Sequence, residues 1–263
     1  MKSIVIAHGE DLDGILSHVL LGSYFSSRPS REVKHVFAGY DSLNQDFESV
    51  VGLESDLIGI ADLSFNQSLV PIVSQLSDSS GAEIFWVDHH PGTKEKEDFL
   101  HEKNIQLYYS DQDCSTMQIY KLFLPDSIYA RGLAEMAQFS DYPGKCFNLG
   151  IGSRLEKLIS LANYKNDKGE LLKITKGLGR LVSSEKENLQ VFEEGKVEEY
   201  DHLEQLAFDH IDSNKVIEQI GDYNFLFSRI SSIIPTKKAT RYLLEKYNSD
   251  ADVFVSLFEA PAR

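Results

Sequence analysis

The stretch IFWVDHHPG, residues 84–92, joins a short apolar run to an acid and two adjacent histidines. Its first four residues have the composition of a buried strand, and the polar residues follow where that strand would end. Two other apolar runs in the first half of the chain end in the same way. Residues 3–7 lead into His8, and residues 56–61 lead into Asp62. Three predicted strands therefore end on side chains that can bind a metal ion.

Strand-like and helical patterns alternate through the first half of the chain. Besides these three strands, the pattern predicts strands at 33–38 and 105–109 and helices at 12–25, 67–76, 115–124 and 128–140. Such alternation is typical of an α/β fold with a mainly parallel sheet flanked by helices. Because parallel strands end at one edge of the sheet, the polar residues that follow them should converge there.

The pattern changes in the second half of the chain. A region rich in Glu and Lys predicts a long, mostly exposed helix over 183–210. Beyond it, the apolar pattern predicts a strand, a helix and another strand of a small α/β unit. The chain is therefore divided into a first domain, a helical linker and a second, smaller α/β domain, at residues 1–182, 183–212 and 213–263.

The composition restricts the class of protein. A net charge of -15 argues against a protein that binds long nucleic acid through a basic surface. No apolar run is long enough to span a membrane, and the apolar run near the N-terminus is too short for a signal peptide. Cys114 and Cys146 are far apart and lack the spacing of a zinc site. These features predict a cytoplasmic protein with reduced thiols and no membrane association.

The candidate ligands at the expected sheet edge are rich in oxygen, with two imidazoles and no thiolate. They are His8, Asp11, Asp13, Asp62, His89 and Asp141. This mixture suits Mn²⁺ or Mg²⁺ better than a structural zinc ion. Six protein ligands suit two ions about 3.5–4 Å apart with one bridging carboxylate. The alternative interpretation is that Asp11 and Asp13 cap the helix that follows them.

Four motifs, in their order along the chain, resemble those of the DHH phosphoesterase superfamily. They are HGEDLDG at 8–14, ADLS at 61–64, DHH at 88–90 and FSDYPG at 139–144. The segment DCSTMQIYKLF at 113–123 also resembles the one that follows the DHH motif in this family. RecJ-like and nanoRNase-like relatives imply a catalytic domain followed by a DHH-associated C-terminal domain. The glycine- and histidine-rich stretch typical of that second domain is absent before Arg263, so we expect either a truncated domain or a different way of holding the substrate.

The resemblance implies a role for each candidate ligand. It assigns to one ion the ligands His8, Asp11 and Asp62. It assigns to the second ion the ligands Asp13, Asp62, His89 and Asp141, so that one carboxylate bridges the pair. Glu10 is a rival to Asp11, because relatives differ in the spacing of this motif.

The resemblance also implies contacts with the substrate. It places His90 beside the scissile phosphate, with Asp88 orienting the histidine pair, and both are expected to serve catalysis. Ser115 and Thr116 are predicted to contact the phosphate or to cap the helix that they begin. His18 is interpreted as an exposed or hydrogen-bonded histidine of the first helix.

The function implied by the resemblance is hydrolysis. We expect a metal-dependent phosphodiesterase or exonuclease that cleaves short oligonucleotides or nucleotides with two divalent ions, Mn²⁺ ahead of Mg²⁺. Two alternatives share the family's motifs, an inorganic pyrophosphatase and a non-catalytic scaffold of a DNA replication assembly. Protein partners in DNA or RNA metabolism and a homodimer are also compatible with the family.

Overall fold

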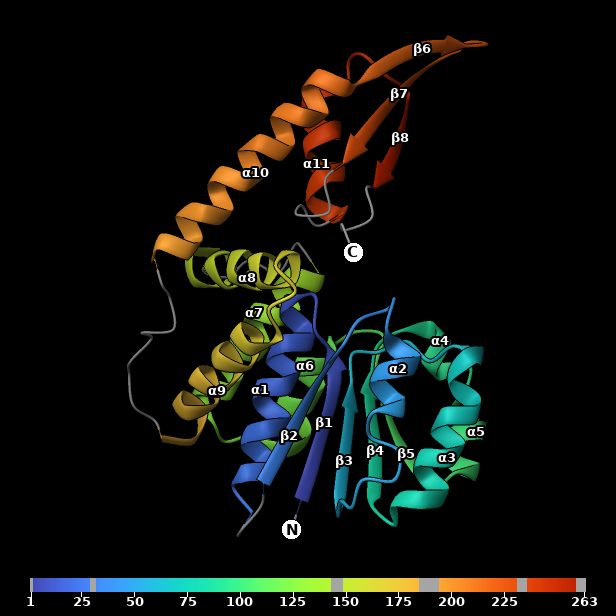
Figure 1. Cartoon of the computed structure of the whole chain (residues 1–263), viewed down its shortest axis with the longest axis vertical. Coiled ribbons are helices and arrows are strands. Elements are labelled where there is room, and N and C mark those ends of the chain that lie inside the picture. Colours follow the sequence, from blue (N-terminus) through green and yellow to red (C-terminus); the bar gives the residue numbers. More distant parts are fainter. Residues whose placement is uncertain (1, 29–31, 143–148, 185–193, 231–235, 259–263) are drawn as a thin grey trace. The chain divides into compact units, whose positions relative to one another are not determined.

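The computed structural model describes residues 2–28, 32–142, 149–184, 194–230 and 236–258 (Figure 1). The chain forms two compact units. The first contains residues 1–159 and 168–191, and the second contains residues 160–167 and 192–263. The sequence predicts a first domain at 1–182, a helical linker at 183–212 and a second domain at 213–263, and these boundaries remain a prediction.

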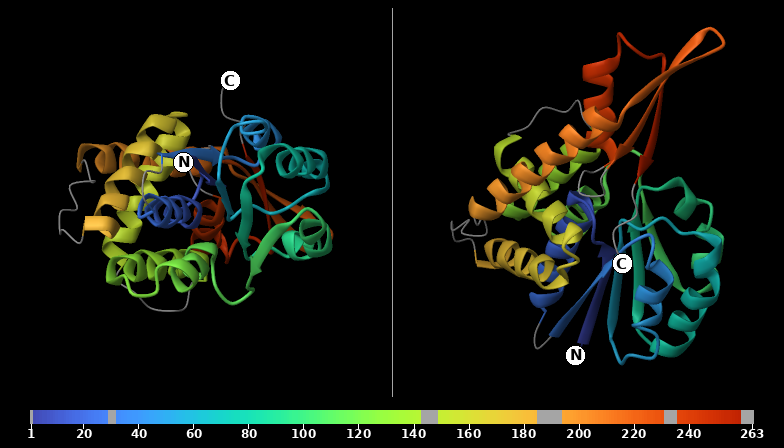
Figure 2. Two further views of the ribbon diagram at one scale, coloured as in Figure 1. Left: turned by 90° about the horizontal axis from the view of Figure 1, so that it is seen from below. Right: turned by 45° about the horizontal axis from the view of Figure 1, so that its top comes forward.

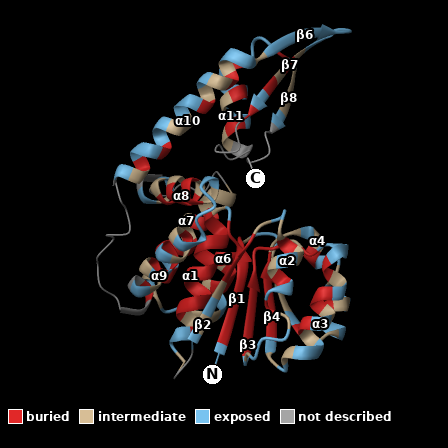
Figure 3. Ribbon diagram, in the orientation of Figure 1, coloured by how far each residue is buried: buried red, intermediate tan, exposed pale blue. Residues whose placement is uncertain are grey.

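The first unit is built on a five-stranded parallel sheet with the order β2-β1-β3-β4-β5. The strands are β1 (Lys2–His8), β2 (Glu32–Ala38), β3 (Leu57–Ala61), β4 (Glu83–Asp88) and β5 (Ile105–Tyr109). The predicted α/β fold with a mainly parallel sheet is confirmed. The central strands are buried along almost their whole length (Figure 3), which explains why they are nearly continuous apolar runs.

Helices cover both faces of this sheet (Figure 2). On one face lie α1 (Leu12–Ser26), α6 (Ser115–Phe123), α7 (Ile128–Asp141) and α9 (Lys168–Ser184). On the other lie α2 (Leu43–Glu48), η1 (Gln67–Leu69), α3 (Val70–Ser80), α4 (Pro91–Lys94) and α5 (Glu97–Glu102). Alternate residues of a strand point to opposite faces, and β1 shows this: Ile4 and Ile6 join the core on the α2 and α3 side, while Val5 and Ala7 between them are also fully buried.

The register brings the carboxyl ends of the strands to one edge. Ala7 pairs with Ala61, and Ala61 pairs with Val87. The residues that follow β1, β3 and β4 therefore meet at the same level of the sheet. The chain order reverses between β1 and β3, and the crevice beside such a reversal is where open α/β sheets place their binding sites.

Gly59 of β3 allows α1 to lie close against the sheet. A Cβ at this position would lie 2.9 Å from Cζ of Phe25 and 3.0 Å from Cζ of Phe85. The space that a side chain at this position would occupy is filled by these two rings, one from α1 and the other from the neighbouring strand β4. Because α1 lies this close to the sheet and is covered in turn by α6, α7 and α9, it is buried along most of its length.

The second unit contains the end of α8 (Leu149–Tyr164), then α10 (Glu194–Asn214), β6 (Val216–Ile220), β7 (Tyr223–Ile230), α11 (Thr236–Tyr247) and β8 (Val253–Phe258). Its three-stranded sheet has the order β6-β7-β8, with β6 antiparallel and β8 parallel to β7. The core joins α10, β7 and α11 through Tyr200, Leu226 and Leu243. The long helix predicted over 183–210 corresponds to α10 from residue 194 onward, and its part at 185–193 lies outside the described residues.

The sequence pattern missed the shortest helices and β6. Helices α2, α4 and α5 have only four to six residues each, too few to show helical periodicity. All five residues of β6 are exposed. Its sequence therefore lacks the alternation of buried apolar and exposed polar residues that would predict a strand. Among the described helices, none has both the length and the apolar character needed to cross a lipid bilayer.

Candidate metal centre

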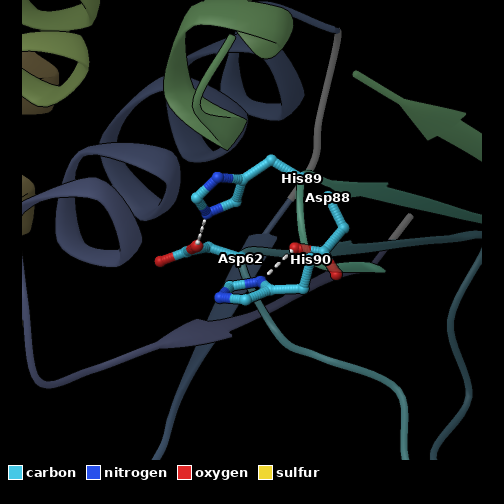
Figure 4. Close-up of side chains that lie close together, drawn as sticks. All are labelled: Asp62, Asp88, His89 and His90. Atoms are coloured by element: carbon cyan, nitrogen blue, oxygen red, sulfur yellow. Dashed lines mark hydrogen bonds and ion pairs between the residues drawn. The ribbon is translucent and has the colours of Figure 1, made fainter. Parts of the chain in front are cut away.

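The polar residues predicted at the sheet edge lie together there. His8 is the last residue of β1. Asp62 directly follows β3, and Asp88 ends β4 and leads into His89 and His90 (Figure 4). Helices supply three more carboxylates: Asp11 at the N-cap of α1, Asp13 in its first turn and Asp141 at the end of α7. The site therefore draws on at least five separate elements of the first unit.

One group of ligand atoms lies at the end of β1. Nδ1 of His8 is 3.3 Å from Oδ2 of Asp11 and 3.8 Å from Oδ2 of Asp62. One ligand atom from each of these three residues lies within 4.8 Å of the others, a spacing that a single cation can bridge. Asp11 also accepts a hydrogen bond from the backbone N–H of Gly14 at 3.0 Å, so the same carboxylate caps α1 and faces the cluster.

Glu10 is the alternative to Asp11 as a metal ligand, and it lies on the other side of the His8 imidazole. Its Oε2 is 3.5 Å from Nε2 of His8, the nitrogen that points away from Asp62. Glu10 does not belong to the group that His8, Asp11 and Asp62 form. The geometry therefore favours Asp11 over Glu10 as a ligand shared with Asp62.

A second group lies at the end of β4. Nε2 of His89 is 3.5 Å from Oδ2 of Asp141 and 4.0 Å from Oδ2 of Asp13. The same nitrogen is 3.2 Å from Oδ1 of Asp62. Asp62 thus presents one carboxylate oxygen to each group, which is the arrangement of a bridging ligand. A further group that meets the same spacing consists of Asp62, Asp88, His89 and His90.

The environment of Asp62 favours bound cations. The residue is buried, and its Oδ2 has no hydrogen-bond partner. Burial, together with the nearby carboxylates of Asp13 and Asp11, holds the pKa of Asp62 well above its usual range. A cation would remove both penalties, because it would coordinate the oxygen and offset the repulsion. The residues present therefore fit the divalent ions that the sequence predicts.

The backbone at Asp62 has an uncommon conformation. Its φ is +54°, in the left-handed region, where Asp and Asn are the side chains best tolerated apart from glycine. The backbone N–H of Asp62 still donates to the carbonyl of Val87 at 3.1 Å, which ties this turn to β4. The strand is thus ended by a turn that directs the carboxylate into the cluster.

His8 is also altered by its carboxylate neighbours. Burial lowers the pKa of His8, but the nearby carboxylates of Asp11, Asp62 and Glu10 outweigh burial and leave the pKa raised. Without cations, the raised pKa values of His8 and Asp62 both favour the protonated forms of these side chains.

We expect cation binding to release these protons. A metal-binding histidine must be neutral and a metal-binding carboxylate must be ionised, so the apparent affinity for Mn²⁺ should rise with pH through the neutral range. Calorimetric titration with Mn²⁺ in two buffers with different ionisation enthalpies should give different apparent enthalpies. The His8→Gln variant should release fewer protons per bound ion. Equal enthalpies in both buffers would show that no proton leaves the site.

Asp13 is held by the first turn of α6. The backbone N–H groups of Ser115 and Thr116 donate to its two carboxylate oxygens at 2.9 and 2.8 Å, and the Thr116 hydroxyl donates to its backbone carbonyl at 2.8 Å. Both residues are fully buried, and the N-cap of α6 is Cys114 rather than either of them. The structure therefore places Ser115 and Thr116 behind Asp13, and a direct contact with phosphate stays a prediction.

Tyr142 orients His89, a role that the sequence did not predict. The Tyr142 hydroxyl lies 3.2 Å from Nδ1 of His89 and donates to the carbonyl of Asp111 at 3.4 Å. With its proton used there, the hydroxyl accepts from Nδ1–H of His89, which makes Nε2 the nitrogen that faces the carboxylates and is available to a cation. The position of Tyr142 directly after Asp141, within FSDYPG, was the one available signal.

Asp88 lies behind His90. Nδ1–H of His90 donates to Oδ1 of Asp88 at 2.8 Å, and the other oxygen of Asp88 accepts from the hydroxyl of Thr93. Thr93 in turn accepts from the backbone N–H of Phe65 at 2.8 Å, which fixes the carboxylate between β4 and the segment after β3. Burial lowers the pKa of His90, but its bond with Asp88 outweighs burial and raises it.

No protein-family model and no curated protein matches the chain, whereas solved structures do. An uncharacterized protein from Helicobacter pylori G27 is 14% identical, with a TM-score of 0.50 over 98% of this chain and 83% of that one. Exonuclease RecJ, in a structure bound to manganese, is 13% identical, with a TM-score of 0.49 over 97% of this chain and 75% of that one. A putative family II inorganic pyrophosphatase from Methanococcus jannaschii is 15% identical, with a TM-score of 0.27 over 98% of this chain and 83% of that one. The matching structures include members of the DHH superfamily, and at these identities the likeness concerns the fold.

Proposed function

We propose that this chain is a metal-dependent phosphodiesterase of the DHH type, which hydrolyses phosphodiester bonds in short oligonucleotides or nucleotides. The proposal is supported by one observation above the others. Two groups of His and Asp ligand atoms meet at Asp62, whose two carboxylate oxygens face His8 on one side and His89 on the other. Ligands that share a carboxylate suit a pair of divalent ions, Mn²⁺ or Mg²⁺.

The residues of the site would either coordinate the ions or hold the coordinating side chains in position. When bound, the ion pair would supply an activated water and neutralise charge on the phosphoryl group. His8, Asp11, Asp13, His89 and Asp141 would complete the coordination around Asp62. Ser115 and Thr116 keep Asp13 in place, and Tyr142 keeps Nε2 of His89 turned toward the carboxylates that would hold the ions with it.

His90 would bind the substrate phosphate. Its Nδ1 is occupied by Asp88, so Nε2 is left to donate to a phosphoryl oxygen. Its raised pKa keeps the ring cationic at a higher pH than an ordinary histidine, which suits an anionic partner. The side chain is 31% exposed, enough for contact with a ligand, whereas Asp88 is fully buried and acts by positioning His90.

The overall charge favours a small substrate. At -15, the chain lacks the excess of cations with which proteins grip long nucleic acid. A dinucleotide or short oligonucleotide presents few phosphates and needs only the ion pair and His90 to neutralise them.

The experiment that tests this function is incubation of the full chain with Mn²⁺ and four substrates. These are a labelled dinucleotide, a longer single strand, a cyclic dinucleotide and pyrophosphate. We expect the dinucleotide to be cleaved fastest and pyrophosphate to be left largely intact, with all cleavage lost in EDTA. Cleavage of pyrophosphate alone would favour the pyrophosphatase alternative. Bound Mn²⁺ without cleavage of any substrate would favour a non-catalytic scaffold.

A further inference from the structure

A polar pocket that shares no lining residue with the candidate metal centre lies between α1, β2 and α9 of the first unit. Figures 1 and 2 show the course of these three elements. Its volume is about 210 Å³, below the roughly 300–1,000 Å³ of pockets that hold drug-sized ligands. Its polar lining comes from His18, Ser23, Ser26, His35, Thr175, Lys176 and Arg180. None of the described residues that line it carries a carboxylate, although the chain as a whole is strongly acidic.

Two histidines in this pocket have protonation states that the hydrogen bonds define. Nε2 of His18 lies 3.2 Å from the carbonyl of Ala7, which can only accept, so Nε2 carries the proton. Nδ1 of a neutral His18 is then an acceptor, and Nδ1 of His35, at 3.4 Å, must donate to it. Nε2 of His35 is left with a lone pair. The sequence interpretation of His18 as exposed or hydrogen-bonded is resolved in favour of a buried, bonded ring.

Both rings are neutral at physiological pH. Burial holds the pKa of His18 well below its usual range, and burial together with the charge of Lys176 lowers that of His35 to about 4. Gly22 leaves room beside the free nitrogen of His35. A Cβ on Gly22 would lie 2.7 Å from Cε1 and 3.2 Å from Nε2 of His35. The pocket therefore contains a fixed hydrogen-bond acceptor.

The rest of the lining offers hydrogen-bond donors and positive charge. The hydroxyl of Thr175 is buried and has no partner, and the residue is only 2% exposed. Lys176 and Arg180, one turn apart on α9, are exposed and bring two cations to the mouth. A buried hydroxyl without a partner is costly unless a ligand or water completes its hydrogen bonds.

We propose that this pocket binds inorganic phosphate and discriminates it from oxyanions that lack a proton. Lys176, Arg180 and the Thr175 hydroxyl would contact the anionic oxygens. The lone pair on Nε2 of His35 would accept the P–OH proton that inorganic phosphate retains at pH 8. Sulfate has no such proton, and a phosphomonoester with a second pKa of about 6 has lost it at that pH, so each would place a bare anionic oxygen against the lone pair.

The test is equilibrium dialysis of the full chain against labelled inorganic phosphate at pH 8, with EDTA present so that the metal centre takes no part. Sulfate and methyl phosphate are the competitors. We expect both to bind at least about tenfold more weakly than phosphate. Equal competition by sulfate, or no phosphate binding up to millimolar concentrations, would overturn the proposal.

Variants on α9 locate the binding. K176A/R180A should weaken phosphate binding by about tenfold or more, since both charged contacts are lost. The matched control is Lys173→Ala, an exposed lysine of the same helix that pairs with Glu170 and does not line the pocket, and it should leave the affinity unchanged. In His35→Phe, the preference for phosphate over sulfate should disappear. Equal affinities in K176A/R180A and Lys173→Ala would place the anion elsewhere.

Discussion

Asp62→Asn is expected to abolish hydrolysis and to lower the number of Mn²⁺ ions bound per chain. The substitution keeps the size of the side chain and a residue type that tolerates the left-handed backbone at φ +54°, but it removes the charge that both ligand groups share. Loss of a residue behind a ligand typically lowers affinity or activity 10–100-fold, so loss of the bridging ligand should exceed about 100-fold. Metal content by mass spectrometry and turnover of the dinucleotide measure the two effects.

The same variant should be more stable than the wild-type chain when both are free of metal. Folding raises the pKa of Asp62, so the folded state binds its proton more tightly than the unfolded state does. The wild-type chain therefore loses stability as the pH rises from the ordinary Asp value of about 3.9 through the raised folded pKa, and Asp62→Asn removes this loss. Urea unfolding in EDTA at several pH values measures it. Asp98→Asn, at an exposed position in α5, is the control and should change neither property. Near-normal metal content and turnover in Asp62→Asn would show that Asp62 does not bridge two ions.

Gly14→Ala is expected to disrupt both the fold and the metal centre. A Cβ at Gly14 would lie 2.1 Å from the backbone oxygen of His8 and 2.6 Å from its Cβ, and no side-chain rotation can relieve contacts with backbone. The start of α1 would have to move away from the end of β1. Because overpacking inside a core typically costs 1–3 kcal/mol, this closer contact should cost about 3 kcal/mol or more. Urea unfolding in EDTA measures the loss, and Mn²⁺ titration should show weakened binding.

Gly132→Ala is the matched control for Gly14→Ala. Gly132 lies within α7, and a Cβ there would meet nothing within 4 Å. Alanine in a helix interior is favoured over glycine by roughly 0.5–1 kcal/mol, so the control should stabilise the chain. The two substitutions make the same chemical change and should have opposite signs. A Gly14→Ala chain as stable as the control would show that α1 does not lie against the end of β1 in this way.

The parallel sheet could be predicted because its central strands are buried on both faces. Apolar runs such as 3–7 and 56–61 can be recognised in the sequence as buried strands. The geometry of parallel strands then predicts that the polar residues at their ends lie at one edge of the sheet. The strand β6 could not be found in this way, because its residues are all exposed and carry no alternation. The shortest helices could not be predicted from the sequence either, because the four residues of α4 complete barely one turn and show no periodicity.

The candidate ligands could be named from the sequence, but their supporting residues could not. His8 and Asp62 follow apolar runs and so draw attention, whereas Thr93 and Tyr142 are ordinary polar residues in turns and helices. Their roles depend on distances across the fold, such as the bond from Tyr142 to Nδ1 of His89. The same holds for the contact between His18 of α1 and His35 of β2, which are seventeen positions apart in the chain.

The ligands at the sheet edge come from segments that are remote in the sequence, the ends of β1, β3, β4 and α7. An unfolded chain therefore has no preformed cage, and any cation that enters the centre binds the native state almost exclusively. Such a cation acts as a tether across the first unit, raising its stability by about 2.7 kcal/mol when its concentration is a hundred times Kd. Supply of the metal would then set how long the protein survives in the cell, quite apart from how fast it turns over.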